Sequence, residues 1–273
     1  MEREIGAAWD RLREARPLIH HITNYVTVND VANITLAAGA SPIMADCPEE
    51  VAEITALSNG LCLNIGTLNE RTLGSMKLAA REAARLKHPL LLDPVGAGAS
   101  ALRSRAAKEI LAAGRVTAIR GNVSEIKSLL AESSHVRGVD AGDDLTDNRE
   151  AAARWAMTAA AKLGAIVAVT GAVDLVADAT RCFAISNGRG EMSRITGTGC
   201  QCSALAAASL AAGSEPLTAT AAALMAMGLA GEIAYEHLQP WEGNATYRNR
   251  IIDAIYHLQG QDLATGARYE IYE

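Results

Sequence analysis

The chain lacks the features of an exported or nucleic-acid-binding protein. Its five cysteines are an odd number and form no Cys-x-x-Cys pair, so they predict reduced thiols and not a disulfide framework. Positive charge is not in excess, because 25 Lys and Arg residues stand against 31 Asp and Glu residues, and we expect no nucleic-acid partner. The opening segment MEREIGAAWDRLREARP has no basic region followed by an apolar one, which predicts a cytoplasmic protein.

The chain also lacks linkers and a convincing membrane segment. No Pro-rich, Ser-rich or highly charged stretch divides its 273 residues, and 49% of them are hydrophobic, so residues 1–273 are expected to form a single domain. Glu215 is the only charged residue between Ile195 and Gly231. That stretch is rich in Ala and interrupted by glycines, which predicts two buried helices and no membrane association.

Two common nucleotide-binding fingerprints are absent. A P-loop ends in Gly-Lys-Ser or Gly-Lys-Thr, and no lysine of this chain follows a glycine. The dinucleotide pattern Gly-x-Gly-x-x-Gly is approached at residues 96–101 and 197–202, but both segments lack the third glycine. A hydride-transfer enzyme is therefore disfavoured.

Short β-prone apolar runs alternate with helical segments along most of the chain. This alternation predicts an α/β fold with a central, mostly parallel sheet flanked by helices on both faces. The expected strands are 18–23, 42–45, 61–65, 89–95, 116–120 and 166–170, followed by a hairpin of 174–177 and 181–185. Parallel sheets bind ligands at the carboxyl ends of their strands, where this chain repeatedly places Asn, Asp, Thr and Gly. The sequence therefore predicts a site along this edge.

A glycine-rich segment predicts an anion site. Gly197-Thr198-Gly199-Cys200 leads into a small-residue helix expected over residues 201–212. The first N–H groups of a helix have no intrahelical partner, and glycines let the backbone approach an oxyanion. An ordinary Gly-rich helix start is the alternative for this segment taken alone.

Seven motifs, in order along the chain, carry a family resemblance. They are HITNYVT at 21–27, GASPIMA at 39–45, LNIGTL at 63–68, DPVGAG at 93–98, IRGN-x-x-E at 119–125, TG at 170–171 and GTGC at 197–200. Together they resemble the hydroxyethylthiazole kinase family of the ribokinase-like superfamily over residues 17–239. The resemblance implies a ribokinase-like fold and transfer of the ATP γ-phosphate to the primary hydroxyl of 4-methyl-5-(2-hydroxyethyl)thiazole, a salvage step toward thiamine.

The resemblance assigns the nucleotide and metal residues. Arg120 and Thr170 match ATP-binding positions, and a guanidinium fork suits phosphate oxygens. Asp93 and Glu125 follow neighbouring strands and are expected to hold Mg²⁺ through water, since Mg²⁺ commonly uses one or two protein carboxylates plus phosphate. Charge compensation at a helix N-terminus is an alternative for Glu125 alone.

The same resemblance assigns the acceptor side of the site. Met44, Gly197 and Asn24 are expected to bind the thiazole, and the anion hole is Gly197, Thr198 and Gly199. Cys200 is the expected catalytic residue and stands where most ribokinase-like kinases place an aspartate base. A helix N-terminus should lower the pKa of this thiol, and whether it orients or deprotonates the hydroxyl stays open.

Other interpretations remain beside this one. The chain is alternatively another ribokinase-like kinase, acting on hydroxymethylpyrimidine or a sugar, or a catalytically silent thiazole-binding protein. The resemblance also implies a homotrimer with thiazole sites at the subunit interfaces. Residues 132–150 form either a mobile flap or a solvated loop. Of the adjacent His20 and His21, one is expected to face the core and one the ligand crevice.

Overall fold

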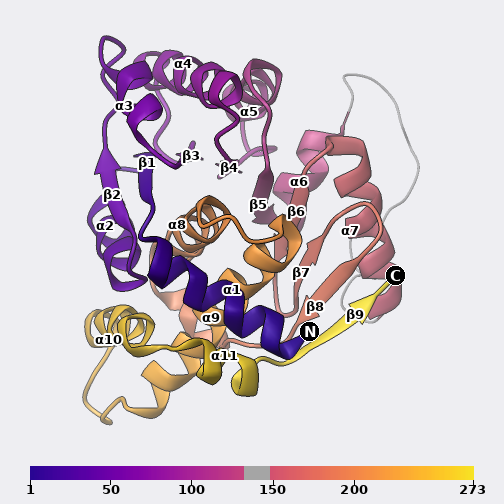
Figure 1. The fold of residues 1–273 in the computed structure, drawn as a ribbon. Coiled ribbons are helices and arrows are strands. Elements are labelled where there is room, and N and C mark those ends of the chain that lie inside the picture. The colour runs from indigo at the N-terminus through magenta and orange to yellow at the C-terminus, as the bar shows by residue number, and fades with distance from the viewer. Residues whose placement is uncertain (132–147) are drawn as a thin grey trace.

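A central sheet of nine strands organises the part of the chain that the structure, a computed structural model, describes, which is residues 1–131 and 148–273 (Figure 1). The strand order is β2-β1-β3-β4-β5-β6-β7-β8-β9. The pairs from β2 to β6 are parallel and those from β6 to β9 are antiparallel. The strands are β1 Leu18–Ile22, β2 Ser41–Met44, β3 Gly60–Asn64, β4 Leu90–Asp93, β5 Ala118–Asn122, β6 Ile166–Thr170, β7 Asp174–Ala177, β8 Cys182–Ile185 and β9 Tyr269–Tyr272.

The predicted strands are all present, and their ends differ where turn chemistry intervenes. β4 stops at Asp93 rather than at residue 95, because Pro94 has no N–H for the ladder and its carbonyl accepts from Ala97 N in a turn. β5 runs on to Asn122 instead of ending at Arg120, since Asn122 still pairs with Thr170 of β6. The short edge strand β9 was not predicted.

Helices cover both faces of the sheet, as the sequence predicts. One core cluster joins the sheet to α1, α2, α8, α9, α10 and α11, and the other joins its opposite face to α3, α4, α5, α6 and α7. The helices are α1 Glu2–Ala15, α2 Val28–Ala37, α3 Val51–Leu57, α4 Glu70–Leu86, α5 Ala101–Ala113, α6 Val123–Leu130, α7 Arg149–Leu163, α8 Thr198–Ala211, α9 Pro216–Glu236, α10 Asn244–His257 and α11 Gly260–Gly266. A 3₁₀ turn spans Gly190–Arg194.

The stretch between Ile195 and Gly231, which contains a single charged residue, forms the two buried helices that the sequence predicts. α8 and α9 are buried nearly all round, and such helices belong to a protein core. Among the described residues, α9 alone is long and apolar enough to cross a membrane, yet 83% of its apolar window is covered by the rest of the fold. Small alanines along both helices let them pack closely on the sheet.

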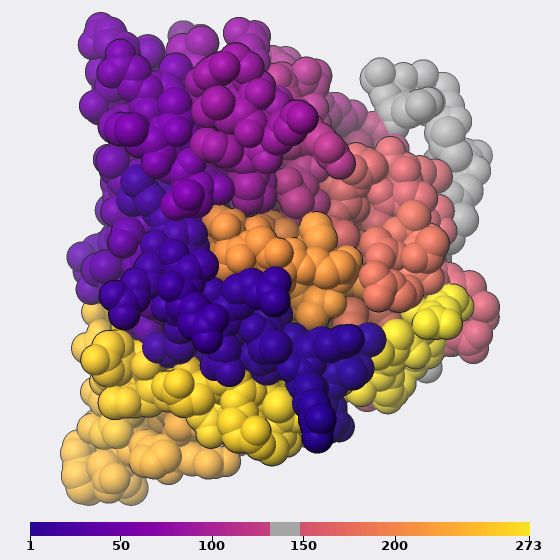
Figure 2. Space-filling model, viewed as in Figure 1, coloured from indigo at the N-terminus to yellow at the C-terminus, as the bar shows by residue number. Residues whose placement is uncertain are grey.

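The two ends of the chain lie against each other. Figure 2 shows the indigo N-terminal segment beside the yellow C-terminal one. Trp9 is fully buried in α1, and its Nε1 donates to Leu258 O at 3.0 Å. Residues 132–147, most of the segment interpreted as a flap or loop, lie outside the described residues.

Candidate active site

Two adjoining cavities lie at the carboxyl ends of the parallel strands. The inner cavity has a volume of about 270 Å³ and is lined by Asn24, Thr27, Asp93, Val95, Arg120, Asn122, Glu125, Thr170, Thr196, Gly197, Gly199 and Cys200. The outer cavity, of about 580 Å³, lies between the turn after β6, residues 187–193, the start of α8 and α9. Arg120, Thr170 and Gly199 line both cavities, so the two meet at these residues.

Most of the predicted site residues converge here. Eight of the ten line the inner cavity, namely Asn24, Asp93, Arg120, Glu125, Thr170, Gly197, Gly199 and Cys200. Thr198 lines the outer cavity. Met44 is absent from the lining of both and packs half-buried against the core at the end of the edge strand β2.

The guanidinium of Arg120 lies where the cavities meet. Its Nη2 donates to Thr170 Oγ1 at 2.8 Å, and its Nη1 is 3.7 Å from Asp93 Oδ2. Burial acts to lower the pKa of Arg120, but Asp93 and other nearby groups outweigh this effect and raise it, so the side chain stays cationic. A Cβ on Gly199 would lie 2.6 Å from Nη1, which explains why a glycine stands opposite this arginine.

Asp93 is a fully buried carboxylate with one oxygen uncommitted. Its Oδ2 accepts from Asn64 Nδ2 at 2.8 Å and from Ser203 Oγ at 2.7 Å. Its Oδ1 has no hydrogen-bond partner within the described part of the chain. Desolvation raises the pKa of Asp93 to about 6, and the charge of Arg120 opposes that rise. Because Oδ1 has no partner and Asp93 lines the inner cavity, this oxygen is available to a ligand there.

Glu125 both caps the start of α6 and lines the inner cavity. Its backbone N–H donates to Asn122 Oδ1, and its own Oε2 accepts from Asn122 N at 2.8 Å, which makes a capping box at the start of α6. Its Oε1 accepts from Gly96 N at 2.8 Å. The carboxylate nevertheless lines the inner cavity with Asp93.

The donor set fits a hard, hydrated cation. No group of three or more His, Cys, Asp or Glu side chains arranged to hold a metal occurs among the described residues. Asp93 and Glu125 instead offer two carboxylates from neighbouring connections, one with an unpartnered oxygen. Such a sparse oxygen set suits Mg²⁺ that keeps most of its waters and also binds phosphate.

The helix α8 begins three residues earlier than the sequence suggests. α8 starts at Thr198, and its first intrahelical hydrogen bond runs from Gln201 N to Gly197 O at 2.8 Å. The N–H groups of Thr198, Gly199 and Cys200 are thus not used by the helix. Gly197 makes this entry possible, because its φ is +93°.

The expectation about the pKa of Cys200 is wrong. The helix N-terminus was expected to lower its pKa, but the thiol is only 9% exposed and its pKa is raised. Desolvation is the main cause, and the nearby Asp93 charge adds to it, while hydrogen bonds and Arg120 act in the opposite direction. Cys200 is therefore a neutral thiol near neutral pH.

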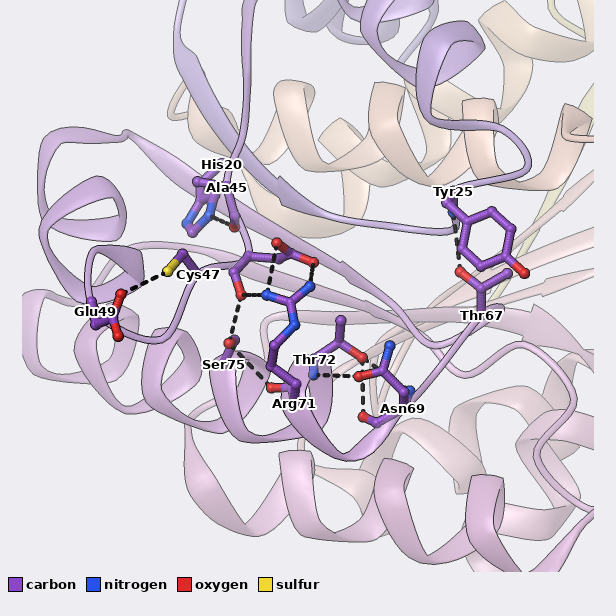
Figure 3. Close-up of polar contacts among 11 residues, drawn as sticks. His20, Tyr25, Ala45, Cys47, Glu49, Thr67, Asn69, Arg71, Thr72 and Ser75 are labelled. Carbon is purple, nitrogen blue, oxygen red and sulfur yellow. Dashed lines mark hydrogen bonds and ion pairs between the residues drawn. The ribbon is translucent and has the colours of Figure 1, made fainter.

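Loop contacts order the turns after β1 and β3 beside the inner cavity. Asn24 Oδ1 accepts from Val26 N at 2.9 Å, which tightens the turn after β1. Figure 3 shows the next contact, in which Tyr25 N donates to Thr67 Oγ1 at 3.1 Å. The turns after β1 and β3 are thereby tied together beside the inner cavity.

The segment after Met44 is fastened to α4. The Arg71 guanidinium makes a forked contact with the Asp46 carboxylate, at 2.8 Å for the closer pair, and Ser75 Oγ donates to Asp46 O at 2.7 Å (Figure 3). Both charged side chains are about half exposed, so this contact orients the loop more than it stabilises the fold.

Neither histidine faces the ligand crevice, contrary to expectation. His20 contacts Thr55 Oγ1 and Ala45 O through its two ring nitrogens, as Figure 3 shows for Ala45. His21 Nε2 lies 3.4 Å from Thr35 Oγ1. Burial lowers the pKa of His20, and it lowers that of His21 to about 3 with the help of His20. Both rings are core residues.

Sequence reasoning missed several polar residues near the site, among them Asn64, Ser203 and Asp174. Asn64 and Ser203 contact Asp93, and Asp174 lines the outer cavity with its pKa raised by desolvation to about 6. The signal for Asn64 was its place at a strand end inside one of the family motifs, whereas Ser203 lies within a helix whose facing was not apparent.

A larger cavity lies at the amino ends of β4, β5 and β6. It has a volume of about 720 Å³ and includes Lys87, His88 and Arg115, but none of the predicted site residues. Lys87 caps the C-terminus of α4, where a cation compensates the helix dipole. Its charge therefore needs no bound anion as an explanation.

Comparison with known proteins identifies a family. Residues 9–261 match the model of the hydroxyethylthiazole kinase family. The chain is 50% identical over 270 residues to a hydroxyethylthiazole kinase of Clostridium acetobutylicum, covering 96% of this chain and 98% of that protein.

Solved structures also resemble this chain. A hydroxyethylthiazole kinase from Pyrococcus horikoshii OT3 is similar with a TM-score of 0.87 and 40% identity, covering 98% of this chain and 99% of that one. A ribokinase-like superfamily protein from Enterococcus faecalis V583 matches with a TM-score of 0.61 at 12% identity, covering 90% of this chain and 93% of that one, a likeness of fold alone.

Proposed function

Because the chain belongs to the hydroxyethylthiazole kinase family and phosphorylates the hydroxyl group of hydroxyethylthiazole, we propose that its two cavities separate the nucleotide from the acceptor. ATP occupies the outer cavity, and its phosphates reach the junction at Arg120 and Thr170. The thiazole alcohol occupies the inner cavity. The observation that supports this division is the convergence of a buried cation, two carboxylates and a helix N-terminus where the cavities meet.

Phosphoryl transfer places few covalent demands on the protein. The hydroxyl oxygen forms a bond to the γ-phosphorus, the bond from that phosphorus to the β,γ-bridging oxygen breaks, and ADP leaves with the electron pair. Charge on the transferring oxygens is then the main quantity to stabilise. In this proposal Arg120 and the N–H groups of Thr198 and Gly199 supply that stabilisation, with Gly197 giving the backbone its close approach.

Asp93 and Glu125 would hold Mg²⁺ through water beside the phosphates, and the ion would neutralise phosphate charge there. Asp93 Oδ1 is the oxygen available for this role. Glu125 adds a second negative charge while its oxygens remain anchored to backbone N–H groups.

Cys200 acts on the acceptor hydroxyl. As a neutral thiol it orients the hydroxyl, whose proton then leaves with the product phosphate; as a thiolate it takes that proton itself. The raised pKa of Cys200 favours the orienting role near neutral pH. Positioning and charge stabilisation supply most of the catalysis in either case.

The proposal includes assembly and location. The protein is a cytoplasmic homotrimer in this proposal, and each subunit is one domain of residues 1–273. Met44 lies at the edge strand β2 and away from the inner cavity, which supports a thiazole site shared between subunits. Asn24 contributes from the turn after β1. A sedimentation mass equal to that of a monomer would refute the shared site.

The test of activity is conversion of hydroxyethylthiazole to its phosphate, followed by mass spectrometry with and without ATP and Mg²⁺. Hydroxymethylpyrimidine and ribose run in parallel. Thiazole phosphate formed only with both ATP and Mg²⁺ supports the proposal, and phosphorylation of another alcohol instead would contradict the acceptor assignment. Thiazole binding without turnover would indicate the silent-binder alternative.

The nucleotide assignment has its own test in Arg120→Lys, which keeps the charge and removes the fork. The KM for ATP should rise roughly tenfold to a hundredfold, because a bidentate charged contact is lost. Arg105→Lys is the matched control, since Arg105 is 62% exposed on α5. Equal KM values for the two variants would refute the role of Arg120.

A further inference from the structure

Asn64 links the two reactive groups of the inner cavity. It ends β3 and is 2% exposed. Its Nδ2 donates to Asp93 Oδ2 at 2.8 Å and to Cys200 Sγ at 3.3 Å. Its Oδ1 accepts from Gly66 N at 2.9 Å. Every polar atom of the amide is therefore engaged, and its orientation is fixed by the Gly66 contact.

The sheet sets the position of this amide, and the turn at Gly66 fixes its orientation. Asn64 and Asp93 are register partners on the neighbouring parallel strands β3 and β4. Cys200 comes from the first turn of α8, which packs over these strands. Two rigid strands and a helix thus set the separation of sulfur and carboxylate, and rigid elements hold reacting groups more accurately than loops do.

An amide suits position 64 because the side chain there donates two hydrogen bonds. Asp93 Oδ2 and the sulfur both accept hydrogen bonds here, and an NH₂ group can donate to two acceptors at once. An isosteric carboxylate would offer no hydrogen and would add a second negative charge next to Asp93. An apolar side chain would leave the sulfur without this donor.

We propose that Asn64 is a positioning residue for phosphoryl transfer, which holds the Cys200 sulfur against the acceptor hydroxyl while it also anchors Asp93. This inference rests on the proposed function. Asn64 engages one lone pair of the sulfur and Thr27 also contacts it, so the S–H group is left for the substrate oxygen. Misplacing the sulfur should reduce the rate of transfer without weakening substrate binding equally.

A second hydrogen bond to Asp93 allows the effect of Asn64 on Asp93 to be separated from its effect on the Cys200 sulfur. Ser203 Oγ also donates to Asp93 Oδ2, at 2.7 Å, so Asp93 keeps one donor when Asn64 is truncated. No contact joins Ser203 to the sulfur in the described hydrogen bonds. Ser203→Ala is therefore the matched control, because it perturbs Asp93 alone.

The test is a double-mutant cycle in the ATP and Mg²⁺ assay with hydroxyethylthiazole. Asn64→Ala should lower kcat roughly tenfold to a hundredfold, and the KM for the thiazole should change less than about threefold. In the Cys200→Ala background the same change should cost less than about twofold, because the sulfur is gone. Ser203→Ala should instead cost the same factor in both backgrounds.

The outcomes are distinguishable. If the unmodified chain forms no thiazole phosphate, the proposed function fails and this inference fails with it. If product forms but the Asn64→Ala penalty is the same with and without Cys200, the positioning role alone is overturned. Should Asn64→Ala fail to fold, Asn64→Leu keeps a similar side-chain volume and adds no charge next to Asp93, but it has no N–H group. It should show the same dependence on Cys200.

Discussion

Gly199→Ala is expected to damage the proposed nucleotide site while it leaves the fold intact. Gly199 lies in the first turn of α8, and its φ is outside the left-handed region, so an alanine fits the backbone. The added Cβ would lie 2.6 Å from Arg120 Nη1. The atom in the way is the end of a flexible side chain, and the arginine will therefore move rather than the helix.

The size of the effect follows from that distance. An ordinary contact is about 3.5 Å, so the guanidinium must retreat by roughly 1 Å. The 2.8 Å contact between Nη2 and Thr170 Oγ1 then exceeds hydrogen-bond length. A misplacement of about 1 Å costs on the order of a hundredfold in rate, and a charged hydrogen bond contributes about 1.5–3 kcal/mol. We expect kcat/KM for ATP to fall roughly tenfold to a hundredfold.

Steady-state kinetics with varied ATP and thermal unfolding form the assay. Gly74→Ala is the control, because Gly74 lies within α4 and a methyl group added there would have no heavy atom within 4 Å. It should leave the kinetics unchanged and stabilise the protein by about 0.5–1 kcal/mol. The Tm of Gly199→Ala should stay within about 3 °C of the original.

Two results would refute this reasoning. Unchanged kinetics in folded Gly199→Ala would show that the position of Arg120 does not matter to the nucleotide. A large loss of Tm would show that the helix, and not the arginine, yields to the methyl group.

Three further predictions concern the neighbouring residues. Cys200→Ala should lower kcat roughly tenfold to a hundredfold, because the acceptor hydroxyl loses the group that orients it, and undiminished turnover would exclude both an orienting role and a base role. Gly197→Ala should reduce the free energy of unfolding by at least about 1–2 kcal/mol, because φ is +93° and the Cβ would lie 2.7 Å from Thr27 Cγ2; an unchanged urea midpoint would contradict this. The pKa of His21 is about 3 in the folded state against an ordinary 6.5. The neutral ring therefore contributes to stability above pH 6.5, and this contribution is lost as the pH falls toward 3. The free energy of unfolding should decrease by at most about 1.4 kcal/mol per pH unit in that range. Urea unfolding at pH 7 and pH 5 should show a smaller loss for His21→Leu than for the original chain, and equal losses would refute the assignment.

The layered fold and the location of the site could be predicted because their signals are local. Apolar runs of four or five residues mark the parallel strands, and the polar residues after them share one edge of the sheet. β9 carries no such signal, since Tyr269–Tyr272 is a short, half-exposed edge strand that depends on pairing with the distant β8. Family resemblance supplied the roles of individual residues, which spacing alone did not.

Contacts within the site could not be predicted, because they depend on which elements pack together. The sequence placed Cys200 near a helix N-terminus, but only the fold shows that the thiol is buried and close to Asp93. Likewise, a glycine-rich stretch suggested a loop before residue 201, whereas the positive φ of Gly197 lets α8 begin at Thr198.

The surroundings of Cys200 give a physical reason for a thiol at this position. Asp93 is fully buried, and its pKa is already raised to about 6 although Arg120 lies 3.7 Å away. A second carboxylate at position 200 would repel Asp93 in this desolvated site and compete for the same guanidinium. A neutral thiol avoids that repulsion and still accepts the hydrogen bond of Asn64. In the proposed function, the buried guanidinium of Arg120 is thus left to Asp93 and the phosphates, and the orientation of the acceptor hydroxyl depends on hydrogen bonds rather than on a fixed negative charge.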